Sequence, residues 1–160
     1  MKPLFAALSV ALLLGTSLNA QAAEQTTPTD RSIQVYKKAD LAEWNRENAA
    51  GGQGPLLGSF AFTRHQTADQ DAFKEIGWLT LPLGASIGQH KHTDNEDVYI
   101  IVSGKGLFTD SEGKQTEVGA GDITIARPGQ SHALKNIGKK PLVFLDLIAE
   151  TAGVKPSQTK

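Results

Sequence analysis

Cysteine is absent from this chain of 160 residues. A protein without cysteine forms no disulfide bonds, carries no redox-active thiol pair and offers no thiol for attachment of a lipid anchor. The fold must therefore be held together by its own hydrophobic core. The length is sufficient for that, because a single compact domain usually needs about 100–200 residues.

The chain also lacks an excess of charge of either sign. Lysine and arginine together number 16, and aspartate and glutamate number 17, which gives a formal net charge of −1. Nucleic acids and anionic lipid surfaces attract proteins with strongly basic patches, so this balance argues against both as partners. The sequence contains no nucleophile elbow and no nucleotide-binding fingerprint, and the glycine-rich stretch 51–54 lacks the Lys-Ser/Thr that completes a phosphate-binding loop.

Long hydrophobic runs are missing, apart from one stretch near the N-terminus. Lys2 precedes an apolar segment over residues 4–14, and the small residues Ala20 and Ala22 follow it, which is the pattern of a cleaved secretory signal peptide. A membrane-spanning helix needs about 20 apolar residues, and this segment is too short. We expect residues 1–22 to be removed during export, which predicts a periplasmic or secreted protein without membrane contact after cleavage.

Residues 23–55 are expected to form an N-terminal arm that precedes the main domain. The arm begins with a polar stretch that has no apolar periodicity. A short helix is expected over residues 40–48, because Asp40 followed three residues later by Glu43 resembles a helix-capping pair. Glycines and a proline then end this helix.

From residue 56 onward the sequence has the pattern of an all-β protein. Short runs rich in β-branched and aromatic residues are separated by turn residues at intervals of roughly 8–12 residues, as in a β-sandwich or barrel. Intervening helices, which a parallel α/β fold requires, are missing. We expect a barrel over residues 56–150 and a flexible tail over 151–160. The expected strands are 56–63, 75–81, 86–92, 98–103, 106–109, 115–118, 123–126, 131–136 and 142–148.

Three of the four histidines fall in two short clusters, and they are the candidate functional residues. His90 and His92 lie in GQHKHTDNED, and His132 lies about forty residues later in RPGQSHALKN. Because side chains alternate along a strand, a His-x-His pair directs both rings to one face, and imidazole is a common ligand of transition metals. The spacing predicts a metal site, formed when the strand that carries His132 lies alongside. His65 lies outside both clusters and is not expected to be a ligand.

The two clusters resemble the two signature motifs of the cupin superfamily, whose members fold as double-stranded β-helices, which are small jelly-roll barrels. In the first motif a glycine precedes His-x-His by five residues and a second glycine follows. In the second motif a glycine and a Pro-x-Gly turn precede a histidine, and an asparagine follows. The matching positions are Gly84, His90, His92 and Gly104 for the first motif, and Gly121, Gly129, His132 and Asn136 for the second. The resemblance implies a divalent metal held by the three histidines and one carboxylate.

The carboxylate position is where this chain departs from the family motif. The family has a glutamate six residues before the second glycine, and this chain has Asp97 there, while Glu96 fits only the shorter spacing after the His-x-His pair. Strand alternation favours Asp97, because a shift of one residue turns a side chain to the opposite face. A β-bulge would instead bring Glu96 inward. Both residues remain candidates for the fourth ligand or a general base.

A second departure is Arg127, which stands where the family usually has proline. Its side chain either projects into solvent or turns inward. In the second case the guanidinium would offer a fork suited to the carboxylate of a substrate.

Imidazole and carboxylate ligands together suit Mn, Fe, Ni, Cu or Zn, and the ligand type alone does not choose among these metals. An ion with four protein ligands keeps open positions for water or substrate. The resemblance therefore implies two kinds of function. The first is an exported metalloenzyme of the oxygenase, decarboxylase or isomerase type that acts on a small oxygenated molecule. The second is a non-catalytic module that binds a sugar or an organic acid.

The resemblance leaves open whether the chain is an enzyme, and it assigns no catalytic residue beyond the candidate ligands. Small cupins commonly pair through their edge strands, and an exposed edge invites such pairing. A homodimer is therefore also open at this point.

Overall fold

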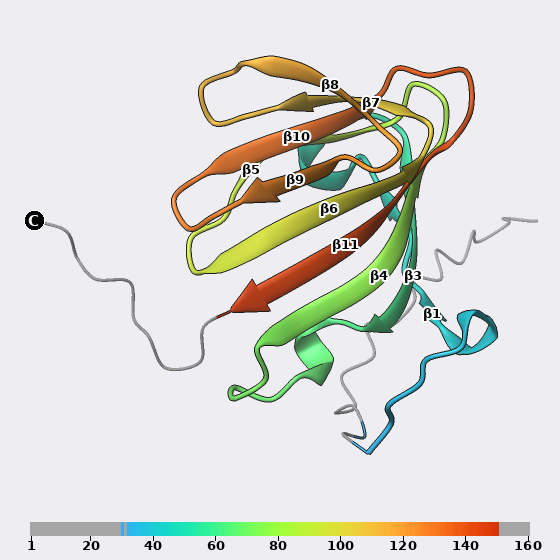
Figure 1. Ribbon diagram of the computed structural model, residues 1–160, viewed down its shortest axis with the longest axis vertical. Coiled ribbons are helices and arrows are strands. Elements are labelled where there is room, and N and C mark those ends of the chain that lie inside the picture. The colour runs from blue at the N-terminus through green and yellow to red at the C-terminus, as the bar shows by residue number, and fades with distance from the viewer. Residues whose placement is uncertain (1–29, 31, 151–160) are drawn as a thin grey trace, which may run out of the picture.

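The structure is a computed structural model that describes residue 30 and residues 32–150. It consists of two antiparallel β-sheets that face each other as a jelly-roll barrel (Figure 1). The larger sheet has the strand order β1-β3-β4-β11-β6-β9, with β2 also paired to β3, and the smaller sheet has the order β5-β10-β7-β8. The expected all-β, double-stranded β-helix fold is thus confirmed.

The strands that follow residue 54 reproduce the expected pattern closely. All nine expected strands are present as β3 to β11, and the largest difference is at the start of β6, which begins three residues earlier than expected. The strands are β1 (Ala42–Glu43), β2 (Arg46–Glu47), β3 (Pro55–Phe62), β4 (Phe73–Leu81), β5 (Ser86–Lys91), β6 (Asn95–Ser103), β7 (Lys105–Thr109), β8 (Gln115–Gly119), β9 (Ile123–Ala126), β10 (Ser131–Asn136) and β11 (Leu142–Glu150). Three short 3-10 turns accompany them: η1 (Lys38–Asp40), η2 (Ala49–Gly51) and η3 (Arg64–Gln66).

The helix expected over residues 40–48 is not formed, and this expectation was wrong. The segment is extended instead, and its two short strands, Ala42–Glu43 and Arg46–Glu47, both pair with β3. Between them, the indole of Trp44 packs edge-on against the ring of Phe60, with 5.5 Å between the ring centroids. Pairing with β3 gives hydrogen bonds to the backbone of the segment and partly buries the side chain of Trp44 against the core. This tertiary gain outweighs a weak local preference for helix.

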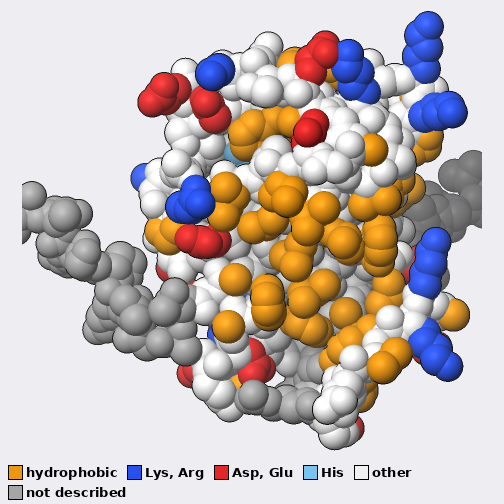
Figure 2. Space-filling model, in the orientation of Figure 1, with side chains coloured by type: hydrophobic (Ala, Val, Ile, Leu, Met, Phe, Trp, Pro, Cys, Tyr) orange, Lys and Arg blue, Asp and Glu red, His pale blue; other side chains and the backbone are white. Residues whose placement is uncertain are grey.

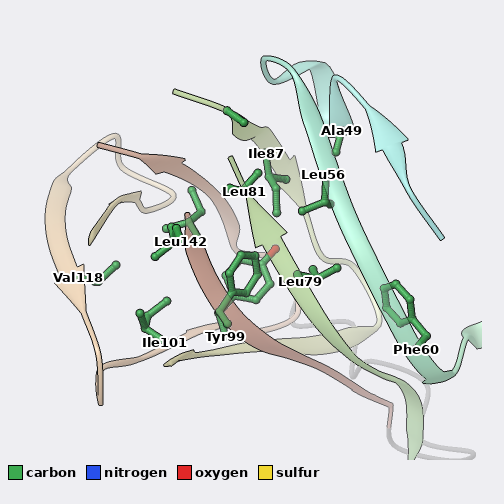
Figure 3. Close-up of a cluster of buried hydrophobic side chains, with 13 residues drawn as sticks. Ala49, Leu56, Phe60, Leu79, Leu81, Ile87, Tyr99, Ile101, Val118 and Leu142 are labelled. Atoms are coloured by element: carbon green, nitrogen blue, oxygen red, sulfur yellow. The ribbon is translucent and has the colours of Figure 1, made fainter. Parts of the chain in front are cut away.

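The hydrophobic core lies between the two sheets (Figure 3) and is built by alternation along the strands. In β11 every second residue from Leu142 to Ile148 is buried, as the period of two along a strand requires. The buried core consists of Ala49, Leu56, Phe60, Leu79, Leu81, Ala85, Ile87, Tyr99, Ile101, Val118, Leu134, Leu142 and Phe144. Several polar side chains are buried among these residues, and they define the site described below.

The larger sheet also carries apolar side chains on its outer face. Trp78 of β4, Val102 of β6 and Ile123 of β9 are all exposed. Figure 2 shows hydrophobic side chains gathered over β4, β11 and β6 on this side of the molecule. The inward and outward faces of the sheet are therefore both partly apolar, and hydrophobic alternation is less strict here than in a sheet with one fully polar face.

The signal peptide expected over residues 1–22 and the tail over 151–160 lie outside the described residues. Within the described part, no helix is both long enough and apolar enough to cross a membrane.

Candidate metal centre

The three motif histidines converge on one point inside the barrel. β5 and β10 are antiparallel neighbours, and their register places His132 directly opposite His90. His92 comes two residues after His90 and therefore returns to the same face. The Nε2 atom of His132 lies 3.1 Å from Nε2 of His90 and 3.0 Å from Nε2 of His92. The structure thus brings together the three imidazoles that the sequence spacing indicated.

Asp97 joins this group from the facing sheet. Its Oδ2 atom lies 3.3 Å from Nε2 of His92 and 3.2 Å from Nε2 of His132. The ligand atoms of His90, His92, Asp97 and His132 all lie within 4.8 Å of one another. We call these four residues the His/Asp cluster.

Glu96 lies outside the His/Asp cluster. Its side chain is 47% exposed, and its Oε1 atom lies 3.8 Å from Nε of Arg127, which is 58% exposed. In the pairing of β6 with β11, Asp97 lies opposite Ile148 and Glu96 opposite Ala149 without a break in register, so no bulge turns Glu96 inward. Of the two carboxylates that the sequence left open, the structure places Asp97 in the cluster. Arg127 lies at the surface beside Glu96 and is not one of the cluster residues.

Hydrogen bonds outside the cluster fix the orientation of two rings. Nδ1 of His90 lies 2.9 Å from the carbonyl oxygen of Gly88, and Nδ1 of His92 lies 2.7 Å from Oδ1 of Asn95. Because each oxygen accepts, each Nδ1 carries the proton and donates, which leaves the Nε2 lone pairs facing the cluster. Metal-binding histidines are commonly held in this way by a partner on the other ring nitrogen.

On the side away from the cluster, the third ring is held by stacking and not by a hydrogen bond to its Nδ1 atom. The ring of His132 lies against Tyr99 with centroids 4.9 Å apart and 20° between the ring planes. Its Nδ1 atom is buried and has no hydrogen-bond partner. Lone pairs from His90 and His92 and the carboxylate of Asp97 thus point at the same space, where a cation would satisfy all of them. The donor set fits a divalent transition metal.

The pKa directions favour the ligand forms of these groups at neutral pH. Burial lowers the pKa of His90, partly opposed by its hydrogen bond to Gly88, so this imidazole is neutral. Burial of Asp97 acts to raise its pKa, but the side chains of His132 and Asp146 and the charge of nearby imidazoles outweigh burial. The pKa of Asp97 therefore lies below its ordinary value, and the group is a carboxylate.

Two further carboxyl groups, Glu75 and Asp146, lie beside the cluster and did not stand out in the sequence. Glu75 is 1% exposed and Asp146 is 3% exposed. Burial raises the pKa of Asp146 well above its ordinary value, and the negative charges of Asp97 and Glu75 add to this effect. Nε of Arg64 lies 3.6 Å from Oε2 of Glu75. The sequence does contain a pattern that could have identified both residues. Each is a carboxyl residue at an inward position of its strand, β4 or β11, and the other inward residues of that strand are apolar or glycine.

One pocket, with a volume of about 260 Å³, is lined by three residues of the cluster, His90, His92 and Asp97, and by the carboxyl groups of Glu75 and Asp146. Drug-sized ligands usually occupy cavities of about 300–1,000 Å³, so this pocket suits a smaller molecule. The charged and titratable residues on its wall, besides the His/Asp cluster, are Arg46, Arg64, Glu75, Lys91, Asp94, Tyr99 and Asp146.

The fold is thus a jelly-roll barrel, and the three histidines and the aspartate gathered inside it could hold a metal ion. The family model described as a cupin domain matches residues 77–148 of this chain. The chain is also 31% identical over 114 residues to an oxalate-binding protein of Thermotoga maritima, a match that covers 71% of this chain and 92% of that protein. This protein therefore belongs to the cupin family.

Solved structures agree with this assignment. The crystal structure of a predicted oxalate decarboxylase from Thermotoga maritima is similar with a TM-score of 0.66 and 29% sequence identity, covering 72% of this chain and 98% of that chain. A gentisate 1,2-dioxygenase of Ralstonia is 34% identical over 73 residues, but the match covers only 46% of this chain and 20% of that enzyme. The likeness to the dioxygenase is thus confined to a minor part of it.

Proposed function

We propose that this protein is a metal-binding cupin that binds a small organic acid at its metal. The observation that carries the proposal is the convergence of three imidazoles and one carboxylate, whose ligand atoms lie within 4.8 Å of one another, beside a pocket lined by His90, His92 and Asp97. His90, His92, His132 and Asp97 would hold the ion. A divalent metal held in this way supplies a Lewis acid with open positions for oxygen ligands.

Two observations support an organic acid as the ligand. Carboxylate oxygens are ligands for every metal that suits this donor set, and a pocket of about 260 Å³ has room for a molecule of a few carbon atoms. The relative from Thermotoga maritima that matches over 92% of its length is an oxalate-binding protein. We therefore take oxalate as the first probe.

The proposal is tested by metal reconstitution and ligand binding. The protein is stripped with a chelator and reloaded separately with Mn, Fe, Ni, Cu or Zn, and the bound metal is counted by elemental analysis. We expect about one ion per chain, and we expect oxalate to raise the melting temperature only of the metal-loaded protein. Failure to retain any of the five metals, or an equal effect of oxalate on stripped and loaded protein, would contradict the proposal.

Turnover of the bound acid is the second candidate function. The observation that favours it is the position of Glu75 and Asp146, which bring two buried carboxyl groups into the pocket beside Asp97. Carboxyl groups in such positions can give or take a proton at a bound substrate. Oxygen uptake or carbon dioxide release with oxalate, diketones or phenolics, in proportion to bound metal, would support an enzyme. Saturable binding without product would support a binding module.

We also propose that the protein acts in the periplasm or as a secreted protein. Support comes from the N-terminal sequence, in which Lys2, a short apolar stretch and the pair Ala20 and Ala22 form an export pattern. Expression of the full chain followed by N-terminal sequencing of the exported product tests this. A first residue of Ala23 is expected, and retention of the first 22 residues in a cytoplasmic product would contradict it.

A further inference from the structure

Arg46 is an unpaired cation at the pocket of the His/Asp cluster. In the described part of the chain, Arg64 pairs with Glu75 and Arg127 lies near Glu96, but Arg46 has no carboxylate partner. Its Nε atom is buried from solvent and has no hydrogen-bond partner. A buried donor without an acceptor is unfavourable, so Nε of Arg46 is placed to donate to an acceptor that the protein itself does not supply.

The side chain of Arg46 is held in place from two sides. Its backbone belongs to β2, which pairs with β3 opposite Leu56. Its guanidinium carbon lies 4.0 Å from the centroid of the Trp44 ring, and that ring packs in turn against Phe60. A guanidinium stacked on an aromatic face loses little further freedom when it binds a ligand. Arg46 is therefore preorganised at the wall of the pocket that His90, His92 and Asp97 also line.

The charges around the pocket leave Arg46 available for an anionic ligand. Glu75 pairs with Arg64, and Asp97 would bind the metal together with the three histidines. The remaining positive charge of Arg46 has no counterpart of its own. A planar guanidinium binds a carboxylate through two parallel hydrogen bonds, and this geometry is stronger and more specific than a point charge.

We propose that Arg46 binds the second carboxylate of a short dicarboxylate whose first carboxylate is bound at the metal. The inference rests on the proposed function and deepens it, because it names the ligand class and the residue that selects it. A monocarboxylate would occupy only the metal. A dicarboxylate of two to four carbons would engage both the metal and Arg46, so the N-terminal arm, which carries Arg46, would set the specificity of the barrel.

The test compares acid binding in matched arginine variants. The full chain is loaded with Zn²⁺, which has no redox chemistry, and oxalate, malonate and acetate are titrated by calorimetry. In Arg46→Gln we expect affinity for oxalate or malonate to fall about 10- to 100-fold, the range for loss of a charged hydrogen bond. Affinity for acetate should stay within about threefold. Arg127→Gln, the same change at an exposed arginine outside the pocket, should bind all three acids as the wild type does.

Arg46→Lys distinguishes the contribution of the bidentate hydrogen bond from that of the positive charge. Lysine keeps the positive charge but cannot form the bidentate contact, so we expect dicarboxylate affinity between those of the wild type and Arg46→Gln. Zinc content and melting temperature are measured for every variant. If Arg46→Gln loses zinc, Arg46→Lys carries the test, and its dicarboxylate affinity must fall by more than about twofold, with acetate affinity unchanged, for the inference to stand.

The possible failures are distinguishable. Dicarboxylate affinity in Arg46→Gln or Arg46→Lys within twofold of the wild type overturns the role of Arg46 and leaves the proposed function intact. An equal loss of acetate and dicarboxylate binding also overturns it, because Arg46 would then act on the metal and not on a second carboxylate. If the zinc-loaded wild type binds none of the three acids, the proposed function itself fails.

Discussion

His90 and His132 stand directly opposite each other on the antiparallel strands β5 and β10, with their Nε2 atoms 3.1 Å apart. The hydrogen bond of His90 to Gly88 through Nδ1 leaves the lone pair of its Nε2 facing His132. This geometry is set by the register of two paired strands and not by a loop. A slip of β10 by one residue would turn His132 to the outer face, so the same register determines both the sheet and the candidate metal centre.

The first prediction is that His132→Ala abolishes metal binding. The substitution removes the ring that contacts both His90 and His92, and only two imidazoles and one carboxylate remain. Elemental analysis should show a fall from about one ion per chain to background. His65→Ala is the control, because His65 is exposed and lies outside the His/Asp cluster, and it should retain the metal. Equal metal content in the two variants would remove the basis of the proposed function.

The second prediction separates the two neighbouring carboxylates. Asp97→Asn should weaken metal binding by more than about 10- to 100-fold, which is the range for loss of an outer partner of a ligand, because Oδ2 of Asp97 lies at the centre of the cluster. Glu96→Gln should leave metal affinity unchanged, since its side chain lies at the surface near Arg127. Competition with a chelating dye measures both affinities. A larger loss in Glu96→Gln would contradict the assignment of Asp97.

Most of the fold and the three-histidine group followed from the sequence because both depend on strand periodicity. Alternation predicts that His90 and His92 share a face, and the second motif predicts that His132 meets them. Alternation also favoured Asp97 over Glu96, and the structure places Asp97 inside. These features need only the local backbone conformation and the order of the strands, which a short-range pattern contains.

The features that the sequence did not reveal depend on long-range packing. The local pattern of Asp40 and Glu43 favoured a helix, but pairing with β3 and contact with Phe60 hold this segment extended. Arg46 lies in the same segment, so its position at the pocket wall could not be inferred while this segment was expected to be a helix. Asp146 could have been recognised as a polar residue in phase with Leu142 and Phe144, but its proximity to Asp97 requires the pairing of β11 with β6.

The third prediction concerns the pH dependence of stability and Asp146. Burial raises the pKa of this carboxyl well above its ordinary value, so between the unfolded and the folded pKa the folded protein binds more protons than the unfolded chain. The stability contributed by Asp146 is therefore fully present below the unfolded pKa, about 3.9, and is lost as the pH rises through the folded value. Asp146→Asn, which resembles the neutral acid, should remove this loss.

Urea unfolding of the metal-free protein at pH 5 and pH 8 measures the effect. The histidines titrate in both proteins, so the difference between the wild type and Asp146→Asn isolates Asp146. We expect the variant to gain stability relative to the wild type as the pH rises. If the stability difference between the two proteins is the same at pH 5 and pH 8, then folding does not alter the protonation of Asp146 in this pH range, and the prediction is wrong.

The fourth prediction links the N-terminal arm to the metal centre through Gly88. A Cβ atom at this position would lie 2.1 Å from the carbonyl oxygen of Ala50 in the turn η2, so Gly88→Ala must displace either the turn or β5. The carbonyl of Gly88 accepts the hydrogen bond that orients His90. Overpacking of this kind costs about 1–3 kcal/mol, and we expect both a lower free energy of unfolding and weaker metal binding.

Gly119→Ala is the matched control, because the nearest atom to a Cβ at that position is 3.9 Å away and the residue does not line the pocket. It should change metal affinity little. Urea unfolding measured with and without metal distinguishes the two effects of Gly88→Ala. If this variant is destabilised while its metal affinity equals that of the wild type, then the contact between η2 and β5 supports the barrel alone, and the hydrogen bond from His90 to Gly88 does not determine how the ring is presented to the ion.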